Sequence, residues 1–153
     1  MTYASPGLIA SLMLLLVACE TSRPATPTPA FTPSAMNNLR WIEGTWHDMT
    51  GITVPYETYR FVSDSLMVIH NYEDRGLTRV RDSSRVYWQD SAVFYETARD
   101  RWRAIRLDTS IIAFEAPNPP RHHFVWKRDS ADAWTATLET TRTPLVFSLE
   151  RVK

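Results

Sequence analysis

The feature that most constrains the fold of this chain is an alternation of apolar and polar residues, which begins at Thr53 and continues to the C-terminus. A period of two is typical of strands with one buried face, and no window holds a helical stripe of useful length. The alternation predicts about nine to eleven short strands. They lie at Gly44–Asp48, Thr53–Val62, Leu66–Glu73, Leu77–Gln89, Val93–Thr97, Trp102–Asp108, Ser110–Glu115, His122–Arg128, Ala133–Thr140 and Leu145–Val152.

Short polar residues make the turns between these runs, because the 153-residue chain has only four glycines. Side chains of Asp, Ser and Thr bond their own backbone and so favour tight turns. The pairs that separate the apolar runs are Asp64-Ser65, Asp82-Ser83, Asp90-Ser91, Asp108-Thr109 and Asp129-Ser130. Sequential hairpins without a long crossover indicate an all-β sandwich or barrel. An antiparallel up-and-down β-barrel is favoured because it leaves no strand edge.

Several strands show which of their faces is buried. The inward sets are His122, Phe124 and Trp126 in one strand, Trp134, Ala136 and Leu138 in the next, and Leu145, Phe147, Leu149 and Arg151 in the last. Arg79, Arg81 and Arg85 fall opposite Val80 and Val86. We interpret these three arginines as a solvated stripe on the outer face of their strand.

A short segment before the strands is expected to plug one end of the barrel. Leu39, Trp41 and Ile42 fit one or two turns of helix. Gly44 then ends the helix, because glycine is a helix breaker, and Trp46 opens the first strand. The sequence therefore predicts a short N-terminal helix that closes the barrel beside Trp46.

The N-terminus has the pattern of an exported protein. Leu8 to Ala18 is an uncharged apolar run, too short to span a bilayer and of the right length for the core of a signal peptide. The run ends in LVAC, residues 16–19, which resembles the lipobox of bacterial lipoproteins, although no Lys or Arg precedes Leu8. The resemblance implies that residues 1–18 are a signal peptide and that Cys19 carries lipid. We therefore expect a protein of the bacterial cell envelope, held by lipid to the outer membrane on its periplasmic side.

Residues 19–35 are expected to be a tether between the lipid and the folded part. Polar and small residues surround Pro24, Pro27, Pro29 and Pro33, so this stretch cannot bury enough apolar surface to fold. Proline favours an extended, semi-rigid spacer of about 40–50 Å. Residues 36–153 remain for one barrel domain. Cys19 is the only cysteine, which excludes a disulfide within one chain.

Gly44-Thr45-Trp46, after a short helical turn and at the start of a barrel, resembles the Gly-x-Trp motif of the calycin group. This group contains the lipocalins, the fatty-acid-binding proteins and the nitrobindins. In these barrels an arginine late in the chain stacks on the tryptophan, and Arg151 has the strand and the phase to do so. The resemblance implies that Trp46 and Arg151 are a structural pair that closes the barrel.

Three further segments resemble a family of bacterial lipocalin-like domains of unknown function: Trp41–Trp46, Glu57–Tyr59 and Phe114–Pro117. That family tends to carry a His-Asp-Phe-Pro run after its Phe-Glu-x-Pro, whereas this chain has Asn-Pro-Pro-Arg at residues 118–121. Any role of that histidine therefore does not transfer. The family implies a barrel and no activity.

Glu57 and Tyr59 are candidate residues of a ligand cavity. They stand with Arg60 in a strand of alternating character. A carboxylate inside the barrel, paired with an arginine, would hold the polar end of a ligand. An ion pair across strands on the outer face is the alternative, and it would contribute little.

His70 and His122 are further cavity candidates, since each shares a face with apolar residues. An interior histidine would suit haem, as the nitrobindin resemblance invites, but the ligand of that group lies near the C-terminus and no histidine follows His123 here. A hydrogen-bonded core histidine is the simpler interpretation. Four aromatic candidates either line a cavity or fill the barrel: Trp88, Phe114, Phe124 and Trp126.

The chain carries no motif of an enzyme. It has no Gly-x-Ser-x-Gly, no phosphate-cradling glycine loop and no metal-ligand cluster, so we expect no catalysis, cofactor or metal. Its formal net charge of zero gives no basic field for nucleic acid. We expect a lipid-anchored barrel that binds a small, mostly apolar ligand at the end opposite Trp46. The alternatives are an envelope protein with a filled barrel that contacts a partner protein, and a haem-binding, nitrobindin-like protein. The sequence does not determine the oligomeric state.

Overall fold

Ten antiparallel strands close into a barrel around one short helix in the computed structural model, which describes residues 28–118 and 122–153. Each strand pairs with its neighbours in sequence, and β1 pairs with β10 to complete the circle. The elements are η1 (Pro33–Ile42), β1 (Gly44–Asp48), β2 (Tyr56–Ser63), β3 (Leu66–Tyr72), β4 (Val80–Gln89), β5 (Ala92–Glu96), β6 (Arg101–Leu107), β7 (Ile111–Glu115), β8 (His123–Arg128), β9 (Ala133–Leu138) and β10 (Leu145–Arg151). The all-β up-and-down barrel expected from the alternation is confirmed.

The start of β4 shows why one predicted strand is shorter than expected. The strand begins at Val80 rather than at Leu77. Asp74 accepts backbone hydrogen bonds from Thr78 at 3.2 Å and from Arg79 at 2.8 Å, and these bonds fold the preceding residues into a turn. Leu77 has a φ of +54° in this turn, a value that a strand does not allow.

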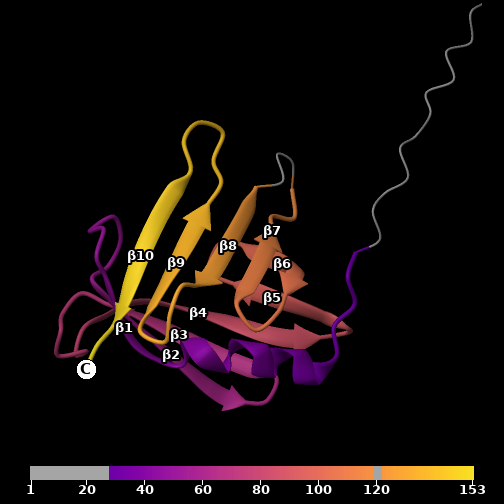
Figure 1. The fold of residues 1–153 in the computed structure, drawn as a ribbon, viewed down its shortest axis with the longest axis horizontal. Coiled ribbons are helices and arrows are strands. Elements are labelled where there is room, and N and C mark those ends of the chain that lie inside the picture. Colours follow the sequence, from indigo (N-terminus) through magenta and orange to yellow (C-terminus); the bar gives the residue numbers. More distant parts are fainter. Residues whose placement is uncertain (1–27, 119–121) are drawn as a thin grey trace, which may run out of the picture.

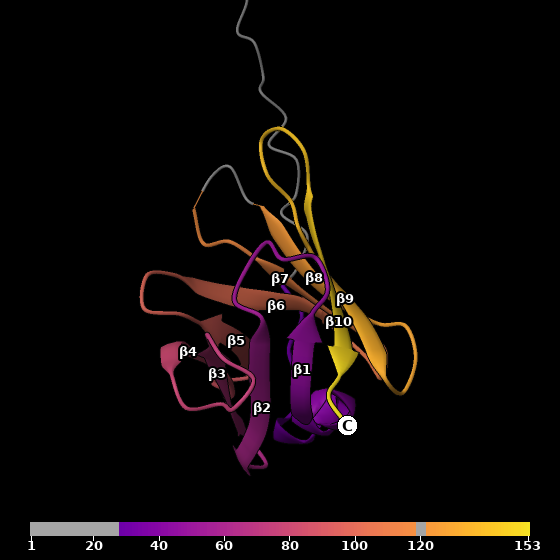
Figure 2. The ribbon, with the colours of Figure 1, turned by 90° about the vertical axis from the view of Figure 1, so that its left-hand side faces the viewer.

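Closure of the barrel sets the direction of three important side chains. Figure 2 shows β1 between β2 and β10. Trp46 of β1 lies opposite Glu57 of β2 and opposite Arg151 of β10. Residues that lie directly opposite each other in an antiparallel pair point to the same face. Because Trp46 is buried inside the barrel, Glu57 and Arg151 also point inward.

Helix η1 covers one end of the barrel, which we call the floor; the other end is the open end. Figure 1 shows the helix beneath the strands. It is a 3₁₀ helix, with three residues per turn, so its buried residues recur every three positions. Met36, Leu39 and Ile42 are all fully buried, and Trp41 is partly buried. No helix among the described residues is long and apolar enough to cross a membrane.

The folded part begins earlier than the boundary expected at Met36. The helix starts at Pro33, and upstream of it the backbone N–H of Phe31 donates to the carbonyl of Ser91 at 2.8 Å. The indole N–H of Trp88 donates to the carbonyl of Phe31, also at 2.8 Å. The last residues of the expected tether 19–35 therefore belong to the barrel domain, while residues 1–27, including Cys19, lie outside the described part.

The interior of the barrel next to the floor is filled by apolar side chains. Its fully buried members from the strands are Trp46, Met67, Val86, Val93, Ala104, Ile112 and Phe114. They join the buried face of η1 in one continuous core. This packing leaves the open end as the part of the barrel where a cavity can form.

One of the three arginines assigned to a solvated stripe departs from that expectation. Arg79 and Arg85 are exposed, and Arg85 pairs with Glu96 across strands at 2.5 Å. Arg81 is an extra residue at a β-bulge in β4, where the pairing with β3 shifts by one position. A bulge re-aims side chains, and Arg81 consequently lines the cavity inside the open end. Arg81 is exposed, as predicted for the stripe, but its predicted position on the outer face was wrong.

Candidate functional site

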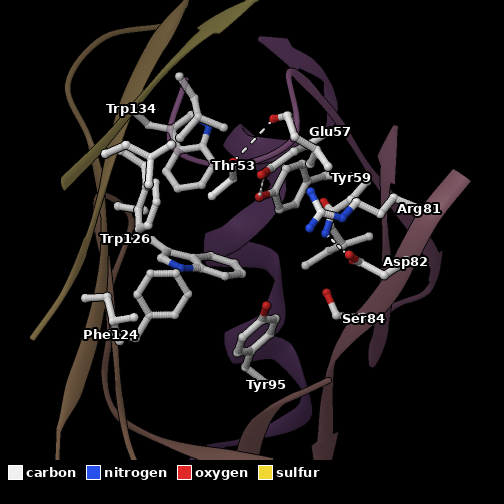
Figure 3. A pocket seen from close by; sticks show the side chains of 18 residues that line it. Thr53, Glu57, Tyr59, Arg81, Asp82, Ser84, Tyr95, Phe124, Trp126 and Trp134 are labelled. Atoms are coloured by element: carbon white, nitrogen blue, oxygen red, sulfur yellow. Dashed lines mark hydrogen bonds between the residues drawn. The ribbon is translucent and has the colours of Figure 1, made fainter. Parts of the chain in front are cut away.

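A cavity of about 340 Å³ occupies the open end of the barrel. One of its walls is polar and comes from β2 to β5, with Glu57, Tyr59, Asn71, Arg81, Asp82, Ser84 and Tyr95 beside the apolar Ile69. The opposite wall is apolar and comes from β8 to β10, with Phe124, Trp126, Trp134, Ala136, Leu138, Phe147 and Leu149. Figure 3 shows the two walls facing each other across the cavity. The remaining lining residues, Ile52, Thr53 and Val54, belong to the loop between β1 and β2.

The apolar wall is held by contacts between its own aromatic rings. The ring centres of Trp126 and Trp134 lie 5.7 Å apart, and Phe124 stands at right angles to Trp126 at 5.7 Å. Tyr59 reaches across from the polar wall and meets both indoles edge-on, at 6.0 Å and 5.7 Å. Such pairs are favourable beyond their buried area, so this wall is a preformed surface for a flat apolar group.

Two polar groups of the apolar wall lack partners. The indole N–H groups of Trp126 and Trp134 have no hydrogen-bond partner among the described residues, and both nitrogen atoms are shielded from the cavity space. These residues are 1% and 2% exposed. Buried polar groups are normally paired, and each unpaired one costs about 1–3 kcal/mol. The hydroxyl of Ser84, on the facing wall, lies within bonding range of Tyr95.

The carboxyl group of Glu57 lies in the polar wall of the cavity and has a raised pKa. The hydroxyl of Tyr59 donates to its Oε2 at 2.5 Å, and its Oε1 has no hydrogen-bond partner among the described residues. The pKa of Glu57 is raised to about 7, mainly by burial and in smaller part by the nearby carboxyl groups of Asp48 and Asp82, while the bond from Tyr59 opposes the rise. Near neutral pH this side chain therefore exchanges between a charged and a neutral form.

Two tyrosine hydroxyls of the polar wall stay neutral. Burial and the adjacent Glu57 raise the pKa of Tyr59 well above its ordinary value. Burial raises the pKa of Tyr95 to about 12. Both hydroxyls therefore remain hydrogen-bond donors throughout the physiological range of pH.

Asp48 positions the loop at the mouth of the cavity. Its carboxylate accepts hydrogen bonds from the backbone N–H groups of Thr50 at 2.9 Å and Thr53 at 3.2 Å, and from both hydroxyls. Burial opposes ionisation, but these hydrogen bonds lower the pKa of Asp48 overall. The bonds also explain why β2 begins at Tyr56 rather than at Thr53, because the intervening residues form the loop.

The predicted structural pair lies between the cavity and helix η1. The guanidinium carbon of Arg151 lies 4.2 Å from the ring centre of Trp46. Two guanidinium nitrogens donate to the carbonyls of Glu43 at 2.9 Å and Trp41 at 3.0 Å. Arg151 therefore joins the last strand to the end of η1 and to β1, and it takes no part in the cavity.

The cavity contains some of the residues that the sequence proposed and lacks others. Glu57, Tyr59, Phe124 and Trp126 line it. Four other candidates are not among the described lining residues: His70, Trp88, Phe114 and His122. His70 belongs to the outer face, where its Nδ1 lies 2.7 Å from the hydroxyl of Ser83. Trp88 and Phe114 belong to the packing near the floor, and His122 precedes β8.

Sequence reasoning did not select several members of the site. The sequence placed Trp134 on the inward face of its strand. Whether an inward residue lines a cavity depends on which side chains of the neighbouring strands lie beside it. Arg81, Asp82 and Ser84 follow one another on β4 with a bulge between them, which a strict period of two does not reveal. Asp48 is followed by Thr50 and Thr53, a pattern that favours a side chain bonded to its own loop but that was not used for the predicted turns.

The described residues contain no group of three His, Cys, Asp or Glu side chains that is placed to hold a metal ion.

No protein-family model matches the chain, and no curated protein matches it. Among solved structures, the chain is similar to a redesigned β-barrel, with a TM-score of 0.37 and 11% sequence identity. The match covers 81% of this chain and 100% of the redesigned one. It concerns the fold alone.

Proposed function

We propose that this chain is a lipid-anchored lipoprotein of the bacterial cell envelope whose barrel binds a small, mostly apolar molecule in the cavity at its open end. The observation that carries the proposal is a cavity of about 340 Å³ in which an aromatic wall faces a polar wall that contains Glu57. Small-molecule sites typically have volumes of about 300–1,000 Å³ and a few placed polar groups in an apolar lining. This cavity fits the lower end of that range, so the ligand is small.

The shape of the two walls supports an amphipathic ligand. The rings of Phe124, Trp126 and Trp134 would cover an apolar body, while Glu57 on the facing wall would bond a polar edge. The haem alternative has less support, because neither His70 nor His122 is among the described lining residues. The filled-barrel alternative also has less support, because the interior at the open end is hollow.

Binding of a neutral fluorescent probe tests this proposal. N-phenyl-1-naphthylamine brightens when it enters an apolar pocket, and we expect it to bind the purified domain. Ala136 lines the cavity, and Ala136→Phe would fill part of it. Thr137 is the next residue on β9 and points to the outer face, so Thr137→Phe adds the same ring outside.

The expected result is that Ala136→Phe weakens probe binding at least tenfold and that Thr137→Phe leaves it unchanged. Far-ultraviolet circular dichroism of both variants shows that each one is folded. Failure of the probe to bind the wild-type domain, or equal binding by the two variants, contradicts the proposal.

A further inference from the structure

We infer that the cavity selects ligands that carry a positively charged amine, with the carboxylate of Glu57 as counter-ion and the indole wall of Trp126 and Trp134 over the apolar body. This inference rests on the proposed function, since it names the chemical class of the ligand for the same cavity. It is carried by the position of Glu57, by the charges around it and by the nature of the opposite wall.

The carboxyl group of Glu57 has room for one more strong hydrogen bond. Tyr59 bonds its Oε2, and Oε1 has no partner among the described residues. A buried carboxylate without a cationic partner is costly, whereas one that is paired and hydrogen-bonded is tolerated. An ammonium group has three donors, so it would supply both the charge and the missing bond.

The charges around Glu57 favour a cation over an anion. Asp48 on β1 and Asp82 on β4 act on Glu57 as like charges. Asp48 already accepts bonds from its own loop, and Asp82 accepts a bond from the amide of Asn71 on β3. The neighbouring titratable groups Tyr59 on β2 and Tyr95 on β5 are neutral, and β8 to β10 add no charged side chain to the described lining.

Arg81 is the cation of the cavity lining, and it must be considered as a competing partner. Its side chain is exposed, and no ion pair joins it to Glu57 within 4.0 Å. Figure 3 shows Arg81 on the polar wall beside Asp82. The described lining therefore holds two carboxyl groups, those of Glu57 and Asp82, against one guanidinium, and the carboxyl group of Asp48 lies near Glu57 outside the lining. An incoming amine meets a negative balance of charge even with Arg81 in place.

The opposite wall suits an organic cation with an aromatic or cyclic body. Indole faces attract cations through the electron density of the ring, more strongly than phenyl faces do. A small aromatic amine would use both walls.

Proton linkage gives the inference a signature in solution. Because burial raises the pKa of Glu57 to about 7, the free protein holds a mixture of charged and neutral forms at neutral pH. A cation binds the charged form, so its affinity should rise as pH increases from 6 to 8 and then level off. A neutral ligand of the same shape should bind with little change over this interval.

The test uses three probes of one shape: 2-phenylethylamine, 2-phenylethanol and 3-phenylpropionate, each added to displace N-phenyl-1-naphthylamine from the purified domain. We expect the amine to bind at least tenfold more tightly than the alcohol at pH 8, with the ratio falling at pH 6. Glu57→Gln should remove the preference for the amine and keep the binding of the alcohol. Arg81→Gln should strengthen amine binding, because it removes the competing cation.

Glu150→Gln is the matched control, because Glu150 is exposed on the outer face of β10. It should leave all affinities unchanged. Probe binding without displacement by the amine, or an alcohol or carboxylate that binds as tightly as the amine, overturns the inference and leaves the proposed function standing. Absence of binding by N-phenyl-1-naphthylamine itself contradicts the proposed function instead.

Discussion

The guanidinium of Arg151 lies over the ring of Trp46 at 4.2 Å, and the indole N–H of Trp46 donates to the carbonyl of Ile42 at 2.6 Å. The side chains of Trp46 and Arg151 therefore connect the end of η1 with β1 and β10. A barrel needs its first and last strands to pair, and this contact lies where that pairing closes the sheet. We expect this pair to contribute to the stability of the closed barrel.

Arg151→Ala should lower the free energy of unfolding by about 1–3 kcal/mol, because it removes packing on Trp46 and three hydrogen bonds to carbonyl oxygens. Equilibrium urea denaturation measures the change. Arg142→Ala in the exposed hairpin between β9 and β10 is the control and should stay within about 0.5 kcal/mol of wild type. Equal effects of the two substitutions would contradict a structural role of the stack.

Gly44→Ala should destabilise the barrel more than Gly51→Ala does. Gly44 has a φ of +136°, where side chains are rarely tolerated, and a Cβ there would overlap Nη1 of Arg151. Gly51 has a φ of +67° and open space around it, so its substitution carries the backbone cost alone, about 1–3 kcal/mol. Thermal unfolding of both variants gives the comparison. The excess cost at Gly44 should shrink when Arg151 is also changed to Ala, and an undiminished excess would show that Arg151 is not its cause.

Glu57 should make the barrel less stable as pH rises. Its pKa is raised from 4.5 to about 7 in the folded protein, so folding retains the proton and the stabilisation is complete below pH 4.5. It is lost progressively as pH rises from 4.5 through 7, by roughly 3–4 kcal/mol in all, since one pKa unit corresponds to about 1.4 kcal/mol. Urea denaturation at pH 5 and pH 8 should show this loss in wild type and a smaller one in Glu57→Gln. A loss of the same size in the variant would assign it to other groups.

Cys19→Ser should abolish lipid attachment. The apolar run that ends in LVAC, residues 16–19, predicts that Cys19 becomes the lipidated N-terminus of the mature protein. In a bacterial host that processes lipoproteins, we expect the wild type in the membrane fraction with the mass of a triacylated protein, and the variant unprocessed or soluble. An unchanged mass and an unchanged fractionation would remove lipid anchoring from the proposed function without touching the cavity.

Much of the architecture followed from local rules. The period of two and four of the five predicted Asp-Ser and Asp-Thr turns placed all ten strands, and β1 was placed at Gly44–Asp48 without error. The turn predicted at Asp82-Ser83 was wrong, because these residues lie inside β4 and pair with Asn71 and His70 of β3. The observed starts of β2 and β4 differ from the predicted ones because an aspartate side chain bonds the backbone of the loop before each strand. Asp48 does so before β2 and Asp74 before β4. The start of the domain was displaced because Phe31 is held by Ser91 and Trp88, which are far away in the sequence.

By itself, the sequence determined the fold class, the phase of the inward faces and the candidates Glu57, Tyr59, Phe124 and Trp126 of the cavity, because alternation along a strand is a local property. Tertiary structure alone decided that the barrel is filled at the floor and hollow at the open end, since free volume depends on how side chains from several strands meet. It also decided that a bulge turns Arg81 inward and that His70 faces outward, because register is a relation between strands. The raised pKa of Glu57 has the same origin: burial by distant segments creates it, and its neighbours in sequence do not.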